Sequence, residues 1–214
     1  MTIESIKEVK SRYTATFILG VEWKDARLTW YDMNEDSNLN IPSEVQKNNI
    51  WFPKILIANS KDNTVVPNDS KSRLCVSKNG NKTLSSKEDL KESALYHGKE
   101  NPIMYKRQFT ENLKCGFDLS FFPFDTQKCS ISFNIKKREK HLINLVGSHV
   151  EFIGNQKLST FNVIRSELEE NDIADDIDVK VNIILKRQIS QHLLSIYLPS
   201  LFIMVIAQVN SFVI

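Results

Sequence analysis

The sequence lacks a strong excess of either charge, since 28 lysine and arginine residues stand against 26 aspartate and glutamate residues and leave a net charge of +2. A nearly neutral chain gives no indication of nucleic-acid binding. Glycine and proline are scarce, at six residues each, which excludes collagen-like and low-complexity sequences. Three cysteines are too few for a cysteine-rich miniature scaffold, and their odd number leaves one over.

Catalytic motifs are also missing. The four histidines are scattered without metal-ligand spacing, and no glycine-rich phosphate loop or nucleophile elbow is present. We therefore expect neither an enzyme nor a bound cofactor.

Charge is absent from the end of the chain. No lysine, arginine, aspartate or glutamate follows Arg187, and Leu193 to Ile214 is mostly apolar. At ~1.5 Å per residue, such a helix can cross a hydrocarbon core of roughly 30 Å. The alternative is a buried core helix, with which a free-standing domain rarely ends. We predict a single transmembrane helix over residues 188–214, with the lipid membrane as a partner.

Both ends of the sequence are unusual for a complete membrane protein. Residues 1–5 include no basic flank followed by an apolar run, so no secretory signal is recognisable. The chain stops within or directly after its apolar segment. We expect a fragment that lacks its signal peptide and first strand and is truncated after the helix.

The pattern of residues 1–187 predicts short strands separated by polar turns. Strand-forming residues gather in the segments 13–19, 26–31, 55–58, 130–135 and 179–185. Such spacing favours the all-β class, as an immunoglobulin-like antiparallel β-sandwich. Two glycosylation sequons, at Asn68 and Asn81, agree with an extracytoplasmic domain.

Cys115 and Cys129 enclose thirteen residues that include four phenylalanines. A disulfide closing a loop of this size would stabilise the fold by roughly 3 kcal/mol, although unpaired buried cysteines are also common. The loop contains Phe122-Pro123-Phe124-Asp125, an aromatic turn with a carboxylate that must be buried or paired. A loop this apolar would seldom lie on a surface without a partner.

This stretch resembles the signature of the Cys-loop, or pentameric, ligand-gated ion channels. Other family motifs follow in the right order: Trp23-Lys-Asp-Ala-Arg-Leu, Trp51-Phe-Pro with Asn59, Tyr105, Thr110, Leu185-Lys-Arg and Tyr197-Leu-Pro-Ser. The resemblance covers nearly the whole chain and is closest to the GABA/glycine-type anion channels. No adjacent cysteine pair precedes the last strand, so the principal-face signature of acetylcholine receptors is missing.

The resemblance implies an extracellular agonist-binding domain of a chloride channel in the plasma membrane, with the postsynaptic membrane as one location. Five identical or different subunits would surround the pore, with a small-molecule or ionic agonist held between neighbours. It also implies a Cys115–Cys129 disulfide whose loop couples binding to gating.

The same resemblance assigns the coupling residues. Phe122, Pro123 and Phe124 would form an apolar tip that presses on membrane-side helices. Asp125 would pair with Arg187, and Glu8 would be a third member. A buried ion pair of this type suits a switch better than a stabilising contact.

The agonist site departs from the family pattern. The complementary face retains Tyr105, whereas the family's aromatic positions fall on Leu56, Lys136 and Asp176. Aromatic rings attract a cationic ligand, and Lys136 would repel one. We expect a poor principal face for GABA, glycine or acetylcholine.

Seven acidic residues crowd the twelve positions from Glu167 to Asp178. They favour a solvated hairpin tip, while a divalent cation held by Glu169, Asp172 and Asp175, or a proton sensor, is the alternative. The basic run from Lys136 to His141 is expected as a surface loop, or as a partner of this tip across a subunit boundary. Cys75 is expected as a small buried strand residue rather than an intermolecular thiol.

Two functions are therefore open. The first is a channel subunit. The alternative is a membrane protein without a pore, such as a truncated subunit or decoy that regulates its partners.

Overall fold

The computed structural model describes residues 1–81, 83–84, 94–136, 138–172 and 177–213. Its strands and helices, in chain order, are β1 (Thr2–Lys7), η1 (Glu8–Lys10), β2 (Arg12–Trp23), β3 (Thr29–Tyr31), η2 (Ser37–Leu39), α1 (Glu44–Asn49), β4 (Ile55–Ile57), β5 (Arg73–Val76), β6 (Thr83–Leu84), β7 (Ala94–His97), β8 (Ile103–Lys114), β9 (Thr126–Ile135), β10 (Phe161–Asp172), β11 (Ile177–Arg187), α2 (Ile189–His192), η3 (Leu193–Tyr197) and α3 (Leu198–Val213).

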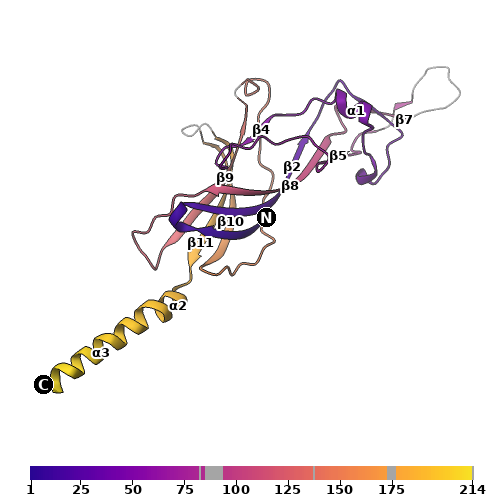
Figure 1. Ribbon diagram of the computed structural model, residues 1–214. Coiled ribbons are helices and arrows are strands. Elements are labelled where there is room, and N and C mark those ends of the chain that lie inside the picture. The colour runs from indigo at the N-terminus through magenta and orange to yellow at the C-terminus, as the bar shows by residue number, and fades with distance from the viewer. Residues whose placement is uncertain (82, 85–93, 137, 173–176, 214) are drawn as a thin grey trace. The chain divides into compact units, whose positions relative to one another are not determined.

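The strands form three sheets, with the orders β1-β2-β8-β5, β10-β11-β9-β4 and β3-β7-β6 (Figure 1). The chain divides into two compact units. The first unit comprises Met1–Ala15, Leu56–Thr64 and Glu111–Ile214, and the second comprises Thr16–Ile55 and Val65–Thr110. The long strands β2 and β8 contribute residues to both.

The first unit is a β-sandwich with antiparallel pairing of β11 to β10 and β9. Side chains alternate between the two faces of a strand, so every second apolar residue enters the core. Tyr13 and Leu113 are buried from one sheet, and Ile131 and Ile183 from the other. The Tyr13 hydroxyl donates to the Ser130 carbonyl at 2.7 Å and joins the two layers. The predicted all-β sandwich is therefore confirmed.

The second unit has an aromatic core. Phe17 of β2 stacks on Phe109 of β8 with 5.6 Å between ring centroids. Phe52 lies edge-on to Tyr105 at 4.9 Å and to Trp23 at 5.5 Å. Aromatic rings bury large apolar areas, and these rings pack with aliphatic residues such as Leu74 and Ile103 in the core of the unit.

Four of the five predicted strands fall within or on β2, β4, β9 and β11. The strand predicted over 26–31 is wrong at its start, because β3 begins only at Thr29. The Asp25 carboxylate accepts from the backbone N–H and the side-chain Nε of Arg27, at 3.1 and 2.9 Å, and holds a turn there. Asp25 is itself buried, so this turn is a fixed part of the unit.

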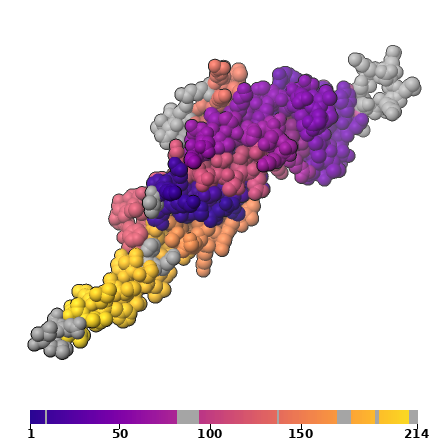
Figure 2. All heavy atoms as spheres, viewed as in Figure 1, coloured from indigo at the N-terminus to yellow at the C-terminus, as the bar shows by residue number. Residues whose placement is uncertain are grey.

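The chain is helical from Ile189 to Val213, as α2, the π-helical η3 and then α3. The helix α3 extends away from the sandwich, and its apolar side chains are exposed (Figure 2). Among the described residues, no helix combines the length and the hydropathy needed to cross a bilayer, and α3 has 16 residues. The transmembrane helix predicted over 188–214 is thus not shown, although the segment is helical.

Candidate functional site

Strand periodicity brings an arginine and an aspartate together inside the first unit. Alternate residues of β11 from Val179 to Leu185 are buried, and the same alternation turns Arg187 inward. Asp125 directly precedes β9, which pairs with β11. The backbone N–H of Arg187 donates to the Asp125 carbonyl at 3.2 Å, and both residues are buried.

The guanidinium of Arg187 binds two carboxylates at once. Its Nε and Nη2 donate to Oδ1 and Oδ2 of Asp125 at 2.6 and 2.9 Å. Its Nη1 and Nη2 donate to Oε1 and Oε2 of Glu8 at 2.8 and 2.9 Å. The exposed fractions of the side chains are 1% for Arg187, 3% for Asp125 and 26% for Glu8. Such bidentate charge-assisted bonds fix orientation, and we call these three residues the arginine clamp.

Two aromatic rings lie against the clamp. The guanidinium carbon of Arg187 is 4.6 Å from the ring centroid of Phe161 and 4.9 Å from that of Phe122. Phe161 is fully buried and stacks on Phe117. Because an aromatic face attracts a cation, these rings stabilise the charged guanidinium in a site from which water is excluded.

Opposing effects set the protonation of the clamp. Burial alone would raise the pKa of Asp125, but hydrogen bonds from Arg187 and Gln127 hold that pKa below its usual range. Burial would likewise lower the pKa of Arg187, and its bonds to Asp125 and Glu8 raise it instead. The aspartate and the arginine therefore stay ionised at neutral pH.

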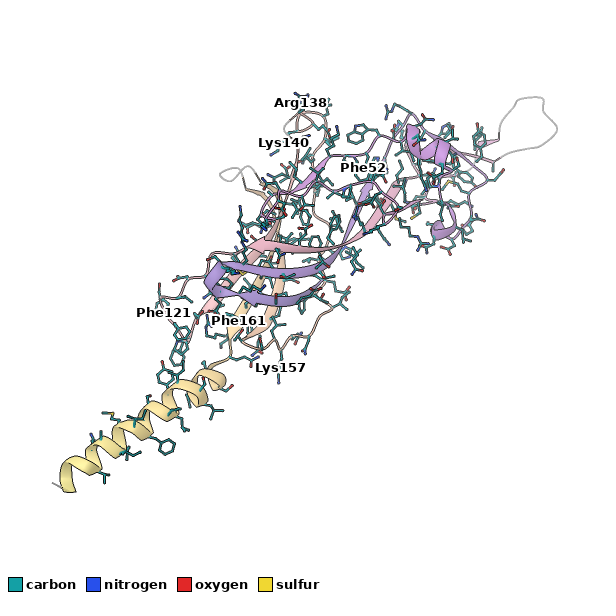
Figure 3. The ribbon with its side chains drawn as sticks, viewed as in Figure 1. Phe52, Phe121, Arg138, Lys140, Lys157 and Phe161 are labelled. Atoms are coloured by element: carbon teal, nitrogen blue, oxygen red, sulfur yellow. A yellow bond between two sulfur atoms is a disulfide. The ribbon has the colours of Figure 1, made fainter. Side chains whose placement is uncertain are left out.

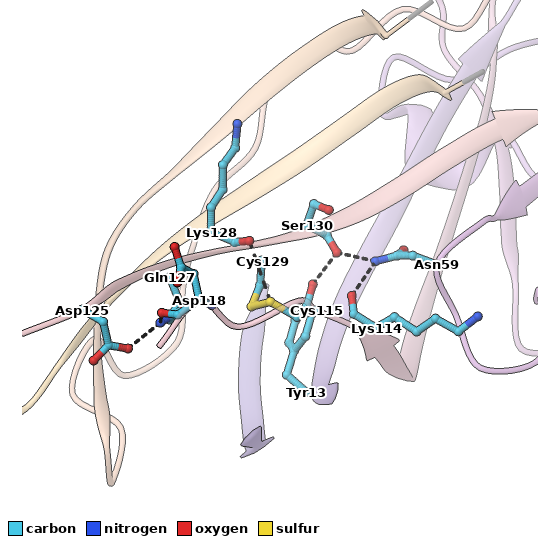
Figure 4. The surroundings of a disulfide bond; sticks show 10 residues. All are labelled: Tyr13, Asn59, Lys114, Cys115, Asp118, Asp125, Gln127, Lys128, Cys129 and Ser130. Atoms are coloured by element: carbon cyan, nitrogen blue, oxygen red, sulfur yellow. Dashed lines mark hydrogen bonds between the residues drawn. A yellow bond between two sulfur atoms is a disulfide. The ribbon is translucent and has the colours of Figure 1, made fainter. Parts of the chain in front are cut away.

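The predicted disulfide is present, with 5.2 Å between the Cα atoms of Cys115 and Cys129 (Figure 4). Inside the loop that it closes, Gln127 Nε2 donates to the Asp125 carboxylate and, at 2.6 Å, to the Asp118 carbonyl. The backbone N–H of Asp118 donates back to Gln127 Oε1 at 2.9 Å. Gln127 therefore joins the beginning of the disulfide loop to its end and orients the carboxylate of Asp125.

A second polar cluster anchors the loop to the sandwich (Figure 4). Asn59 Nδ2 donates to the carbonyls of Ser130 and Lys114 at 2.5 and 3.3 Å, and its Oδ1 accepts from the Ser132 N–H at 3.0 Å. Tyr13 reaches the same Ser130 carbonyl. The end of β8, directly before Cys115, and β9, which carries Cys129, are thus fixed to a common point.

The tip of the loop is apolar and exposed. Phe121 and Phe124 are 77% and 69% exposed, whereas Pro123 between them is buried. Phe122 is half-exposed and is also the ring that covers Arg187. Figure 3 shows Phe121 at the end of the first unit from which the helical tail leaves. The tip therefore touches the clamp on one side and offers apolar surface on the other.

Three of the four candidate agonist residues lie in the described part of the chain. In the first unit, Leu56 is half-buried on β4 and Lys136 is exposed just after β9. In the second unit, Tyr105 is fully buried on β8, and its hydroxyl donates to the Pro67 carbonyl at 2.7 Å. Asp176 lies outside the described residues. Tyr105 therefore serves the core of its unit, and its role in ligand binding stays a prediction.

The acidic hairpin pairs with cations of its own chain. Glu169 accepts from Asn182 Nδ2 at 2.6 Å and lies 3.3 Å from Lys128 Nζ. Lys140 Nζ lies 3.1 Å from Asp178, so one lysine of the basic run pairs within the chain. Lys136 and His141 at the ends of that run are exposed, as a surface loop requires, and pairing across a subunit boundary stays a prediction. No group of three possible metal ligands occurs among the described residues. Asp172 ends β10, and Asp175 lies outside the described part of the chain.

Three peripheral predictions concern single residues. Asn68 and Asn81 are exposed, as glycosylation requires, but their modification stays a prediction. Cys75 is buried on β5 and its thiol has a raised pKa because of that burial. The predicted buried strand cysteine is therefore confirmed.

Sequence comparison identifies related proteins. Residues 1–189 match the family model described as the neurotransmitter-gated ion-channel ligand binding domain. The chain is 20% identical over 220 residues to a glutamate-gated chloride channel of Drosophila melanogaster and 25% identical over 226 residues to the rho-3 subunit of the rat (Rattus norvegicus) gamma-aminobutyric acid receptor. In each case 98% of the chain aligns with 42% of the relative. The chain thus spans about two fifths of the length of these relatives.

A third relative belongs to another branch of receptors. The alpha-4 subunit of the neuronal acetylcholine receptor of Mustela putorius furo is 28% identical over 153 residues, which cover 70% of the chain and 20% of that subunit. The matched family consists of ion channels rather than enzymes. The predicted resemblance and the predicted absence of enzymatic function are both confirmed.

Proposed function

This chain belongs to the neurotransmitter-gated ion-channel ligand-binding domain family, and from that membership we propose that it is the extracellular part of a pentameric channel subunit. Residues 1–187 form the immunoglobulin-like ligand-binding domain, and residues 188–214 form the first transmembrane helix. The partners are other subunits of the pentamer, and the location is the plasma membrane. The similarity to a chloride channel and to a gamma-aminobutyric acid receptor subunit supports a chloride-conducting pore.

The arginine clamp is the observation that best supports a role in coupling ligand binding to channel opening. Its carboxylates come from two separate segments, the η1 turn and the disulfide loop, and both hold an arginine two residues before α2. A displacement of either segment relative to β11 must break or strain hydrogen bonds of Arg187. Since β11 continues into the tail, that change reaches the base of the helix. A bistable ion network of this kind suits a switch between closed and open channels.

The residues at the expected agonist site differ from the family pattern, and this difference limits the class of ligand. By the family resemblance, position 136 corresponds to a ring of an aromatic box for a cation, and the residue here is an exposed lysine. The agonist is therefore a small molecule or ion other than GABA, glycine or acetylcholine when this chain supplies the principal face.

Electrical recording from a chimera tests the proposal. Residues 1–187 are joined to the transmembrane part of the rat rho-3 subunit and expressed in oocytes, alone and with the intact rho-3 subunit. Amino acids, amines, protons and divalent cations are applied in turn. We expect an agonist-evoked chloride current from the chimera, and its loss on Arg187→Gln when the current is normalised to the amount of protein at the surface.

The matched control is Arg165→Gln, because Arg165 forms an exposed ion pair with Glu167 on β10. This variant should keep the current. A chimera that reaches the surface, gives no current and suppresses the current of co-expressed rho-3 would support the regulatory alternative and contradict the channel proposal.

A further inference from the structure

A hollow of about 390 Å³ lies where β10 and β11 meet the start of the tail. The residues that line it come from the segment before β10, from both strands and from α2. This volume is within the usual range of small-molecule sites. In Figure 3, Lys157 marks this end of the first unit.

The strand register aligns three polar side chains along one wall. Asn162 lies directly opposite Lys186 on β11, and Lys157 forms a β-bridge with Asn162 from the other side. Directly paired residues of antiparallel strands project to the same face, and neighbouring strands are ~4.8 Å apart. Two lysines therefore flank one amide in a row across three segments.

Several side chains of the lining can donate hydrogen bonds. Gln188 Nε2 donates to Asn162 Oδ1 at 2.9 Å, which leaves the Asn162 amino group free to donate. Ser190 adds a hydroxyl to the lining. Within the described part of the chain, no carboxylate lines the hollow, and Arg187 is already bound by the two carboxylates of the clamp, so the lysines are the cations left to attract an anion.

The lysine charges are not balanced in the same way. Lys157 and Lys186 have no ion-pair partner among the described residues. A pair of ammonium groups beside an amide and a hydroxyl matches a tetrahedral oxyanion with several acceptor oxygens.

The position of the hollow indicates where the oxyanion comes from. Ile189 and Ser190 in its lining begin the tail, and no charged residue follows Arg187. Apolar side chains from Leu193 to Val209 are exposed along that tail. Resting on the proposed function, in which the tail enters the bilayer, the hollow lies at the depth of the phospholipid phosphates. We propose that it binds the phosphate head group of an anionic phospholipid.

Binding of a short-chain lipid to the full chain in neutral detergent tests this site. The probe is dioctanoyl phosphatidylglycerol, compared with dioctanoyl phosphatidylcholine and inorganic phosphate by titration calorimetry. A lysine near an anionic lipid surface contributes about fivefold in affinity, so K157A/K186A should weaken phosphatidylglycerol binding by at least about tenfold. The charge-retaining K157R/K186R should bind like the wild type.

The control is K61A/K114A, which removes two exposed lysines of the same unit outside the hollow. It should leave binding unchanged. Equal phosphatidylglycerol binding by K157A/K186A would overturn the proposal. Equally tight binding of inorganic phosphate or of phosphatidylcholine would overturn the preference for an anionic lipid.

A separate measurement distinguishes this proposal from the proposed function. Extraction of cell membranes with alkaline carbonate reports whether the tail is inserted, and K157A/K186A leaves the tail intact. Release of the wild-type chain by carbonate would contradict the transmembrane tail, whatever lipid the hollow binds in detergent. Retention of the chain together with lysine-independent lipid binding would contradict only the lipid site.

Discussion

The first unit contains ion pairs of the same chemistry in two very different surroundings. In the clamp, Arg187 is buried between two carboxylates and two aromatic rings. Along the hairpin of β10 and β11, Glu167 pairs with Arg165 of β10, and Glu169 pairs with Lys128 of the neighbouring β9, both in contact with solvent. Water and salt screen the hairpin pairs and can solvate a charge that has lost its partner. A charge of the clamp is buried and would stay unpaired if its partner were removed. The difference indicates that the hairpin charges serve solubility and that those of the clamp constrain geometry.

Removal of the clamp arginine should break this comparison most clearly. Arg187→Ala leaves Asp125 buried without a cation, so we expect a loss of about 3–5 kcal/mol in the free energy of unfolding. Arg165→Ala should cost less than about 1 kcal/mol. Urea denaturation of both variants, followed by tryptophan fluorescence, measures the contrast, and equal losses would show that burial does not matter here.

A triple variant separates the cost of an unpaired charge from the value of the intact clamp. In Glu8→Leu, Asp125→Leu and Arg187→Met together, no charge is left without a partner. Apolar replacement of a whole buried network is often neutral. The triple variant should thus be more stable than Arg187→Ala alone.

The disulfide should have the next largest effect. Cys115 and Cys129 are separated by 14 positions, and a loop of that size stabilises by roughly 3 kcal/mol. Cys115→Ala with Cys129→Ala should lower the urea midpoint and make it insensitive to reductant. Cys75→Ala should leave the reductant sensitivity of the protein intact, because Cys75 is a free cysteine.

Acid should weaken the clamp more than the hairpin. Hydrogen bonds from Arg187 and Gln127 outweigh the effect of burial and lower the pKa of Asp125 from its usual 3.8 in the folded chain. The unfolded chain then binds the proton more readily, so this stability is present above about pH 4 and is lost as the pH falls through the lowered value. Unfolding midpoints between pH 7 and pH 2.5 should fall less steeply in Asp125→Asn.

The same pH profile of unfolding midpoints should be measured for Glu169→Gln, which changes a carboxylate of the hairpin. The pKa of Glu169 is also lowered, by hydrogen bonds from Asn182 and Lys128. Its side chain is 46% exposed, and solvent screens its contribution. A pH profile that changed more in Glu169→Gln than in Asp125→Asn would contradict the distinction between the two regions.

The aromatic cover of the clamp should give the smallest effect. Phe122→Leu keeps apolar surface but removes the ring beside Arg187, at an expected cost of about 0.5–1 kcal/mol. Phe124→Leu changes an exposed ring of the same tip and should cost less. Denaturation of both at two salt concentrations measures the difference, and equal costs would mean that the guanidinium gains nothing from the ring.

Local patterns allowed much of this structure to be predicted. Alternating apolar residues located four strands, and the resemblance located the disulfide and the three clamp residues. The helix α1 was not predicted, although Ser43 and Gln46 form its capping box and are three positions apart in the sequence. That short signal was available but lies in a polar stretch that resembled a turn.

Contacts between distant segments could not be predicted in the same way. The contact of Phe161 with Arg187 depends on how strands pack and has no sequence signal of its own. Opposite charges in the two segments suggested pairing, but not that Lys140 and Asp178 would meet within one chain. Tyr105 matched a family position, yet its burial follows from the inward face of β8 rather than from its identity. Spacing along the chain fixes which residues share a strand face, while packing decides what each face meets.

The clamp also sets an order of events during biosynthesis. Arg187 follows Asp125 by 62 positions and Glu8 by 179. A ribosome makes the chain from its N-terminus, so both carboxylates are synthesised well before the arginine. The sandwich can close around them only after the last strand has left the ribosome. The clamp can therefore form only once the strand that joins the sandwich to the tail has been made.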